Sequence, residues 1–172
     1  YSRCITRGLV SSMLPTIYNF GNQIVQAPGY VVIRNEMIHE ARIIPLDGRP
    51  HVGSKLRTFL GDPRGHWEGN TLVVETTNFK DRSPATNYQG STDKLQLIER
   101  FTLINPSTIR YEFTVSDPTT WTRPWSAESP LPRIQPPLYE FACHEQNYGL
   151  INVVKGAQAA EAERAAQKAL GK

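Results

Sequence analysis

The sequence contains little cysteine and no long apolar segment. Two of its 172 residues are cysteines, Cys4 and Cys143, and their wide separation excludes the CxxC spacing of redox motifs and compact zinc sites. The two thiols are therefore either buried and free or joined in one long-range disulfide, and we predict the disulfide. A membrane-spanning helix needs about 20 apolar residues in a row, and no apolar run in the sequence is nearly that long, so no transmembrane segment is expected.

The charge is too small and too scattered to favour a nucleic-acid partner. Nineteen Lys and Arg residues against sixteen Asp and Glu residues give a net charge of +3, and the basic residues form no stripe. The G-x-S-x-G, P-loop and G-x-G-x-x-G motifs are all missing. Serine α/β-hydrolase, NTPase and Rossmann folds are therefore without support, and no cofactor is predicted.

What the sequence does contain is a succession of short strand-like segments separated by turn residues. Pro28-Gly29, Asp47-Gly48 and Gly69-Asn70 suit tight reversals of the chain. β-Branched and aromatic residues are frequent in the segments between them. We predict strands at 23–27, 30–35, 37–46, 66–68, 71–79, 94–104, 108–116, 119–126 and 138–143.

This pattern has no alternating helices and predicts a mainly β fold, either an antiparallel β-barrel or a barrel-like sandwich. A lipocalin-like barrel is one form of the prediction, because Gly65-His66-Trp67 is similar to the G-x-W at the barrel entrance of lipocalin-like proteins. Residues 1–155 form the predicted β domain, with an irregular N-terminal arm at 1–21 and a polar loop at 80–93. Residues 156–172 are rich in Ala, Glu and Gln and predict a C-terminal helix or tail.

Glu99 is the first candidate for a functional side chain. In the predicted strand 94–104, alternation places it on the same face as Leu97 and Phe101. A carboxylate on an apolar face needs an Arg, a hydroxyl or a raised pKa, and such positions are enriched in functional sites. We expect Arg123 as the partner of Glu99, either in a structural buried ion pair or in a catalytic site.

Aromatic and basic residues alternate in the predicted strand 119–126. Trp121, Arg123 and Trp125 share one face, either as an exposed platform for a sugar or aromatic ligand or as a buried cation–π stack. Together with polar groups that interrupt other apolar strand faces, they predict a ligand site in a barrel mouth or cleft. Its predicted members are His39, Arg42, Trp67, Glu99, Arg123 and Trp125.

The four histidines are weighed as metal ligands and as bases. His39, His51, His66 and His144 all have carboxylates nearby in the sequence, but no pair has the HExxH spacing. We interpret most of them as surface or hydrogen-bonded structural residues and predict no metal site. His144 and Glu99 are retained as candidate catalytic bases, with Arg123 stabilising developing negative charge.

A set of short motifs extends over nearly the whole chain up to about residue 154. They are Arg3-Cys4, Ile24-Val25-Gln26, Pro28-Gly29, the IHEAR run at 38–42, the LDGRPH run at 46–51, Gly61-Asp62, the WEGNTLVV run at 67–74, Glu99-Arg100-Phe101, Asp117-Pro118, the TRPW run at 122–125 and Cys143-His144-Glu145. In these motifs the chain resembles an uncharacterised family of secreted bacterial proteins, common in soil and environmental genomes. The resemblance implies export and a longer precursor with sequence upstream of Tyr1, and it implies no particular activity.

The function expected from the sequence is therefore the binding of a small molecule or glycan by a secreted or periplasmic protein. Two alternatives stay open. One is a hydrolase or lyase that uses a Glu or His base with Arg stabilisation. The other is a structural subunit of an extracellular or envelope assembly, which would self-associate through the N-terminal arm and the C-terminal helix.

Overall fold

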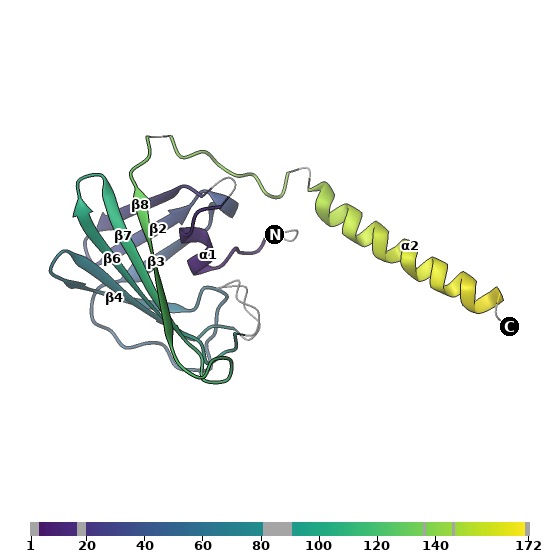
Figure 1. Cartoon of the computed structure of the whole chain (residues 1–172), viewed down its shortest axis with the longest axis horizontal. Coiled ribbons are helices and arrows are strands. Elements are labelled where there is room, and N and C mark those ends of the chain that lie inside the picture. The colour runs from purple at the N-terminus through teal and green to yellow at the C-terminus, as the bar shows by residue number, and fades with distance from the viewer. Residues whose placement is uncertain (1–3, 17–19, 81–90, 136, 146, 171–172) are drawn as a thin grey trace. The chain divides into compact units, whose positions relative to one another are not determined.

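The computed structural model describes residues 4–16, 20–80, 91–135, 137–145 and 147–170 (Figure 1). Along the chain its elements are α1 (Leu9–Met13), β1 (Asn22–Ala27), β2 (Tyr30–Asn35), the 3₁₀ turn η1 (Met37–His39), β3 (Ala41–Pro45), β4 (Asp62–Glu68), β5 (Thr71–Thr77), β6 (Gln96–Asn105), β7 (Thr108–Ser116), β8 (Trp125–Pro132) and α2 (Tyr148–Leu170). The chain divides into two compact units, residues 6–141 and residues 1–5 with 142–172.

The first unit, residues 6–141, contains two antiparallel sheets. One has three strands in the order β1-β2-β3, and the other has five in the order β4-β5-β6-β7-β8. The mainly β prediction is confirmed. The described strands form two separate sheets and not a closed barrel, so of the two predicted forms the sandwich fits.

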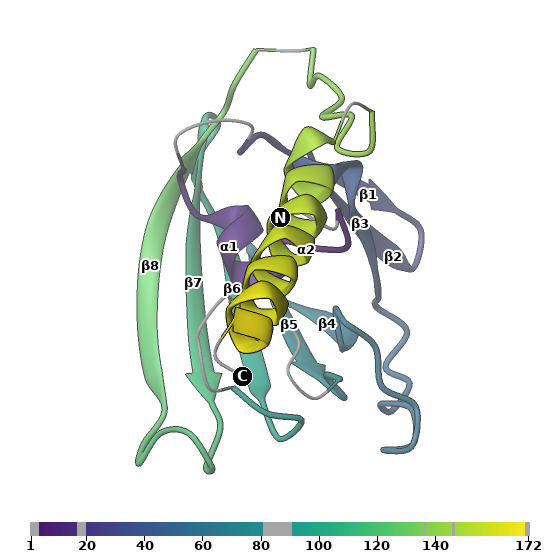
Figure 2. The ribbon, with the colours of Figure 1, turned by 90° about the vertical axis from the view of Figure 1, so that its right-hand side faces the viewer.

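The core lies between the inner faces of the two sheets. Side chains that alternate along β2, β6 and β7 meet there, among them Ile33, Leu97 and Phe113. Helix α1 contributes Leu9, Val10 and Met13 to the same cluster. Figure 2 shows α1 between β7 and the three-stranded sheet. The arm at 1–21 is therefore not only irregular, because one helical turn of it fills the interior.

Gly65 allows β3 and β4 to approach closely. A Cβ atom at this position would lie 2.7 Å from Ile44 Cγ2 and 2.8 Å from Leu46 Cδ2, both inside van der Waals contact. A side chain there would push the two strands apart. The glycine of the Gly65-His66-Trp67 triplet thus has a packing role at the junction of the two sheets.

Several predicted elements differ from the observed ones. The strand predicted at 37–46 begins only at Ala41, because Ile38 (φ 64°) and His39 (φ 43°) take left-handed backbone conformations within a 3₁₀ turn. The strand predicted at 138–143 is absent from the part of this segment that the structure describes, which extends without a sheet partner after Pro137. Most of the polar loop predicted at 80–93 lies outside the described residues.

The strand predicted at 119–126 is also wrong, since β8 begins only at Trp125. Asp117 organises a turn instead. Its carboxylate accepts hydrogen bonds from the backbone N–H (3.0 Å) and the hydroxyl (2.6 Å) of Thr119, and its carbonyl accepts from Trp121 N–H at 2.9 Å. Local hydrogen bonds of this kind compete with strand pairing. β8 then continues to Pro132, through residues we had assigned to a proline-rich connection.

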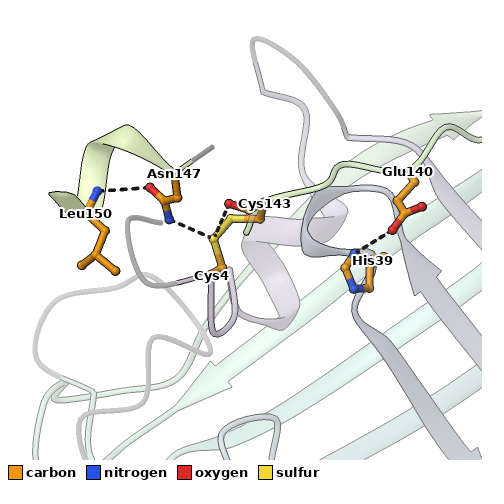
Figure 3. Close-up of a disulfide and its surroundings, with 6 residues drawn as sticks. All are labelled: Cys4, His39, Glu140, Cys143, Asn147 and Leu150. Carbon is orange, nitrogen blue, oxygen red and sulfur yellow. Dashed lines mark hydrogen bonds and ion pairs between the residues drawn. A yellow bond between two sulfur atoms is a disulfide. The ribbon is translucent and has the colours of Figure 1, made fainter. Parts of the chain in front are cut away.

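The second unit contains the disulfide and α2. Cys4 and Cys143 are bonded, with Cα atoms 5.7 Å apart, which confirms the predicted pairing, although Cys143 lies in a bend and not in a strand. Asn147 caps the helix by accepting a hydrogen bond from Leu150 N–H at 3.1 Å, and its amide donates to Cys4 Sγ at 3.3 Å (Figure 3). The helix begins at Tyr148, eight residues before the predicted start, because Asn147 supplies this cap. None of the described helices is sufficiently long and apolar to cross a membrane.

The disulfide closes a loop with a sequence separation of 139 residues. We predict that the double variant Cys4→Ser/Cys143→Ser loses up to about 5 kcal/mol of unfolding free energy, because the open chain regains loop entropy when it unfolds. Urea unfolding of the variant and of the wild type, each with and without a reductant, measures this loss. Equal midpoints for the variant and the oxidised wild type would contradict the prediction.

Candidate functional site

A buried ion pair joins the two sheets. Arg42 extends from β3 and Glu99 from β6, and both are almost completely buried, with exposed fractions of 7% and 0%. The two guanidinium nitrogens of Arg42 donate to the two carboxylate oxygens of Glu99, at 2.5 Å and 2.8 Å. Tyr111 on β7 donates its hydroxyl to Glu99 Oε1 at 2.8 Å. The carboxylate is thus enclosed by two donor side chains, one from each sheet.

Apolar side chains surround this pair. Cross-strand register places Arg42 beside Ile33, and it places Glu99 between Val74 and Phe113. The Arg42 guanidinium also lies 5.9 Å from the centroid of the Phe101 ring. Burial alone would lower the pKa of Arg42, but the adjacent Glu99 carboxylate outweighs it and raises that pKa. Arg42 therefore keeps its positive charge inside the core.

Glu40 is a second carboxylate close to this interior. It accepts a hydrogen bond from the Thr6 hydroxyl at 2.7 Å. Burial raises the pKa of Glu40 and outweighs the opposing effects of the Thr6 hydrogen bond and the nearby Arg42 charge. Glu40 directly follows the left-handed residues Ile38 and His39, so the strained turn positions this carboxylate.

The residues predicted to form one site are not brought together. Arg42 and Glu99 meet in the core, whereas His39 and Arg123 are exposed and Trp67 is 46% exposed on β4. His39 lies 3.9 Å from the Glu140 carboxylate. His144 is exposed in the second unit.

The expected pairing of Glu99 with Arg123 is wrong, since the partner of Glu99 is Arg42. The physical reason is the turn after Asp117, which removes Arg123 from any strand face. Trp121 and Trp125 pack edge to face with ring centroids 5.9 Å apart, and Trp125 also packs against Phe113. The two indoles are therefore not spaced along an extended strand with a guanidinium between them.

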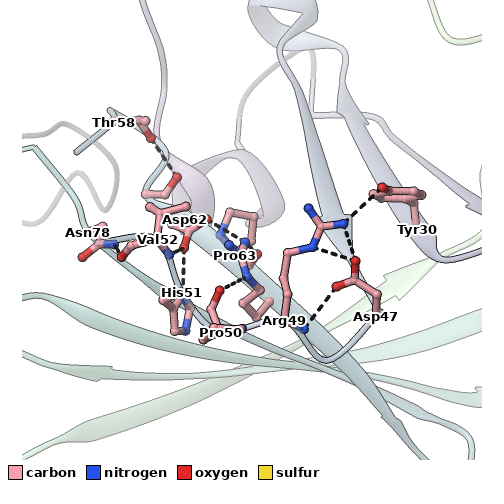
Figure 4. Close-up of polar contacts among 12 residues, drawn as sticks. Tyr30, Asp47, Arg49, Pro50, His51, Val52, Thr58, Asp62, Pro63 and Asn78 are labelled. Carbon is pink, nitrogen blue, oxygen red and sulfur yellow. Dashed lines mark hydrogen bonds and ion pairs between the residues drawn. The ribbon is translucent and has the colours of Figure 1, made fainter. Parts of the chain in front are cut away.

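A polar cluster fixes the loop that follows β3 (Figure 4). Asp62 accepts hydrogen bonds from the Val52 N–H at 2.9 Å and from Arg64 at 2.6 Å, and it lies 3.1 Å from His51 Nδ1. Arg64 also donates to the Pro50 carbonyl at 3.1 Å. His51 is thus held in this cluster by its contact with Asp62. Among the described residues, no group of three or more His, Cys, Asp or Glu side chains could hold a metal ion.

A cavity of about 440 Å³ lies elsewhere in the first unit. Its walls come from β1, from the hairpin between β6 and β7, from the end of β8 and from the chain after α1. Apolar lining residues include Met13, Phe20, Ile24, Leu103, Ile109, Pro130, Leu131 and Ile134, and polar ones include Asn22, Glu36, Ser107, Thr108 and Arg133. None of the six predicted ligand-binding residues lines it. Sequence reasoning missed the cavity because its walls come from strand ends and connections, which have no period.

No family model, curated protein or solved structure matches this chain.

We predict that Arg42→Met destabilises the protein by about 3–5 kcal/mol, because it leaves the Glu99 charge buried without its partner. Adding Glu99→Gln should recover most of this loss, since the amide is neutral and its oxygen can still accept from Tyr111. Urea unfolding of the two variants measures both effects. The matched control is Arg49→Met, which removes an exposed ion pair with Asp47 and should leave the unfolding midpoint unchanged. A double variant as unstable as the single one would contradict the prediction.

We also predict that Glu40→Gln becomes increasingly stabilising as the pH rises. The folded-state pKa of Glu40 lies above its ordinary value of 4.5, so the folded wild type binds the proton more tightly than the unfolded chain. Wild-type stability is therefore lost as the pH rises from 4.5 through the folded pKa, and the variant escapes this loss. Urea unfolding of both proteins at a series of pH values from 4.5 upward tests this. A difference that is constant or shrinks as the pH rises would contradict it.

Proposed function

We propose that this chain is an exported binding protein that holds an apolar small molecule in the cavity beside β1. The cavity is the observation that carries the proposal. Its volume of about 440 Å³ falls within the roughly 300–1,000 Å³ typical of small-molecule sites. Its walls are mostly apolar with a few polar groups, which is the usual composition of such sites.

The lining favours an apolar ligand over a glycan. Ile24, Ile109 and Leu131 offer the ligand aliphatic surface, and burying that surface is favourable for an apolar body. Glu36 and Arg133 place opposite charges in the lining, where they could orient a polar end of the ligand. Trp121 and Trp125, which the sequence suggested as a platform for sugar stacking, instead pack edge to face against the core. Like the lipocalin-like prediction, the proposal places a ligand between strands, but it does not require a closed barrel.

The other two predicted functions gain less support. Glu99 is buried and enclosed by Arg42 and Tyr111, and its partner is not the expected Arg123, so the first unit does not form the expected water-accessible pair of a Glu base and Arg123. For a structural subunit, α2 does present exposed apolar side chains, including Ile151 and Val153. No described residue shows what would cover them.

Export is part of the proposal and has two supports. The Cys4–Cys143 disulfide suits an oxidising compartment such as the periplasm or the extracellular space. The motifs that resemble the family of secreted bacterial proteins point the same way.

The proposal predicts saturable binding of a neutral apolar fluorescent probe, N-phenylnaphthylamine, to the full chain. Ile24→Trp fills part of the cavity with an indole and should weaken probe binding roughly tenfold or more. Ile43→Trp makes the same substitution on the outer face of β3, where the side chain is 60% exposed, and should leave binding unchanged. Fluorescence titration measures both affinities, and thermal unfolding checks that both variants are folded. Wild-type protein without a saturable signal, or equal loss in both variants, would refute the proposal.

A further inference from the structure

The free edge of β1 is the feature of this fold with the clearest capacity for association. In the described residues β1 pairs only with β2, so its other side has no strand partner. Glu36 N–H donates to the Gly21 carbonyl at 2.8 Å, so the hydrogen bonds between β1 and β2 involve Gly21 and the odd-numbered residues of β1. Backbone groups alternate in direction along an antiparallel strand, so Asn22, Ile24 and Gln26 turn their N–H and C=O groups toward the open side. Among the described residues, no backbone group from outside the sheet forms a hydrogen bond with the backbone of these three residues.

This edge has none of the features that usually block edge pairing. The strand Asn22–Ala27 contains no charged residue and no proline, and its register with β2 is unbroken. The edge strand β8 is different. Arg133 N–H donates to the Ser107 carbonyl at 2.7 Å, so the even-numbered residues of β8 turn outward, and these include Glu128, Pro130 and Pro132. Proline has no N–H, which leaves the edge of β8 poorly suited to pairing.

We propose that β1 pairs antiparallel with β1 of a second copy of this chain, around a two-fold axis at Ile24. This register places Asn22 opposite Gln26 of the partner's strand and Ile24 opposite its own copy, so every outward backbone group of these residues finds a partner. The strand is uncharged, so it meets itself without the like-charge repulsion that would prevent self-pairing. The proposal does not rest on the proposed ligand, although Asn22 and Ile24 also line the cavity.

The outer face of the sheet adds apolar contact to this pairing. Register aligns Val25, Val32 and Ile43 in one row across the three strands, and Val25 and Ile43 are 44% and 60% exposed. Pairing around Ile24 sets the Val25 side chains of the two copies diagonally across the new junction, within reach of each other. The exposed row would thus continue from one copy into the next.

Charge substitutions at Val25 test the proposal on the full chain by sedimentation equilibrium. We expect the wild type to have the mass of two chains at concentrations where Val25→Lys and Val25→Glu each have the mass of one, because like charges then face each other across the junction. An equimolar mixture of the two variants should regain the mass of two chains. Ile43→Lys, on the same outer face but on β3, two strands away from β1, should behave as the wild type.

Each outcome decides the proposal. A wild type that stays at the mass of one chain up to its solubility limit overturns it, even if the monomer captures an extended peptide. Dimers that persist in both Val25 variants place the contact elsewhere, for example on α2, and also overturn it. Thermal unfolding shows whether the variants are folded, and recovery in the mixture cannot come from unfolded chains.

Discussion

The buried pair of Arg42 and Glu99 is the constraint on which the arrangement of the two sheets depends. Each sheet contributes one charged side chain, Arg42 from β3 and Glu99 from β6. Such a pair adds little net stability compared with well-packed apolar residues, but a displaced partner would leave an uncompensated charge in the interior. The pair therefore restricts how the three-stranded sheet can slide or rotate over the five-stranded one.

Strands in both sheets could be predicted from sequence where buried and exposed residues alternate regularly. The bounds of β2 and β7 agree with prediction, and Glu99 lies on the buried face as expected. Its partner was not predictable in the same way. Alternation tells which face a side chain occupies but not which strand lies across the core, and consecutive apolar residues at Ile43 and Ile44 left the orientation of Arg42 ambiguous.

The features that escaped prediction depend on contacts distant in sequence or on backbone conformations without a sequence signal. Ile38 and His39 take left-handed conformations that β-branched and bulky residues rarely adopt, so nothing local indicates the turn. The turn after Asp117 competes with a strand that Trp121, Arg123 and Trp125 favour by composition. The structure therefore does not contain the candidate site inferred from those alternating residues. The cavity is instead lined by strand ends and connections.

The cavity and the free edge of β1 follow from one property of the fold, the open seam between β1 and β8. A closed barrel would require these two edges to exchange backbone hydrogen bonds, and β3 to pair with β4 as well. The outward positions of β8 include Pro130 and Pro132, which cannot donate them, so the seam stays open and α1 fills part of the interior beside it. The unfilled part is lined by Ile24 on one side and Leu131 on the other. The missing pairing between β1 and β8 therefore has two consequences. It leaves backbone groups of β1 free to pair with another strand, and it leaves a space beside β1 that a small molecule can occupy.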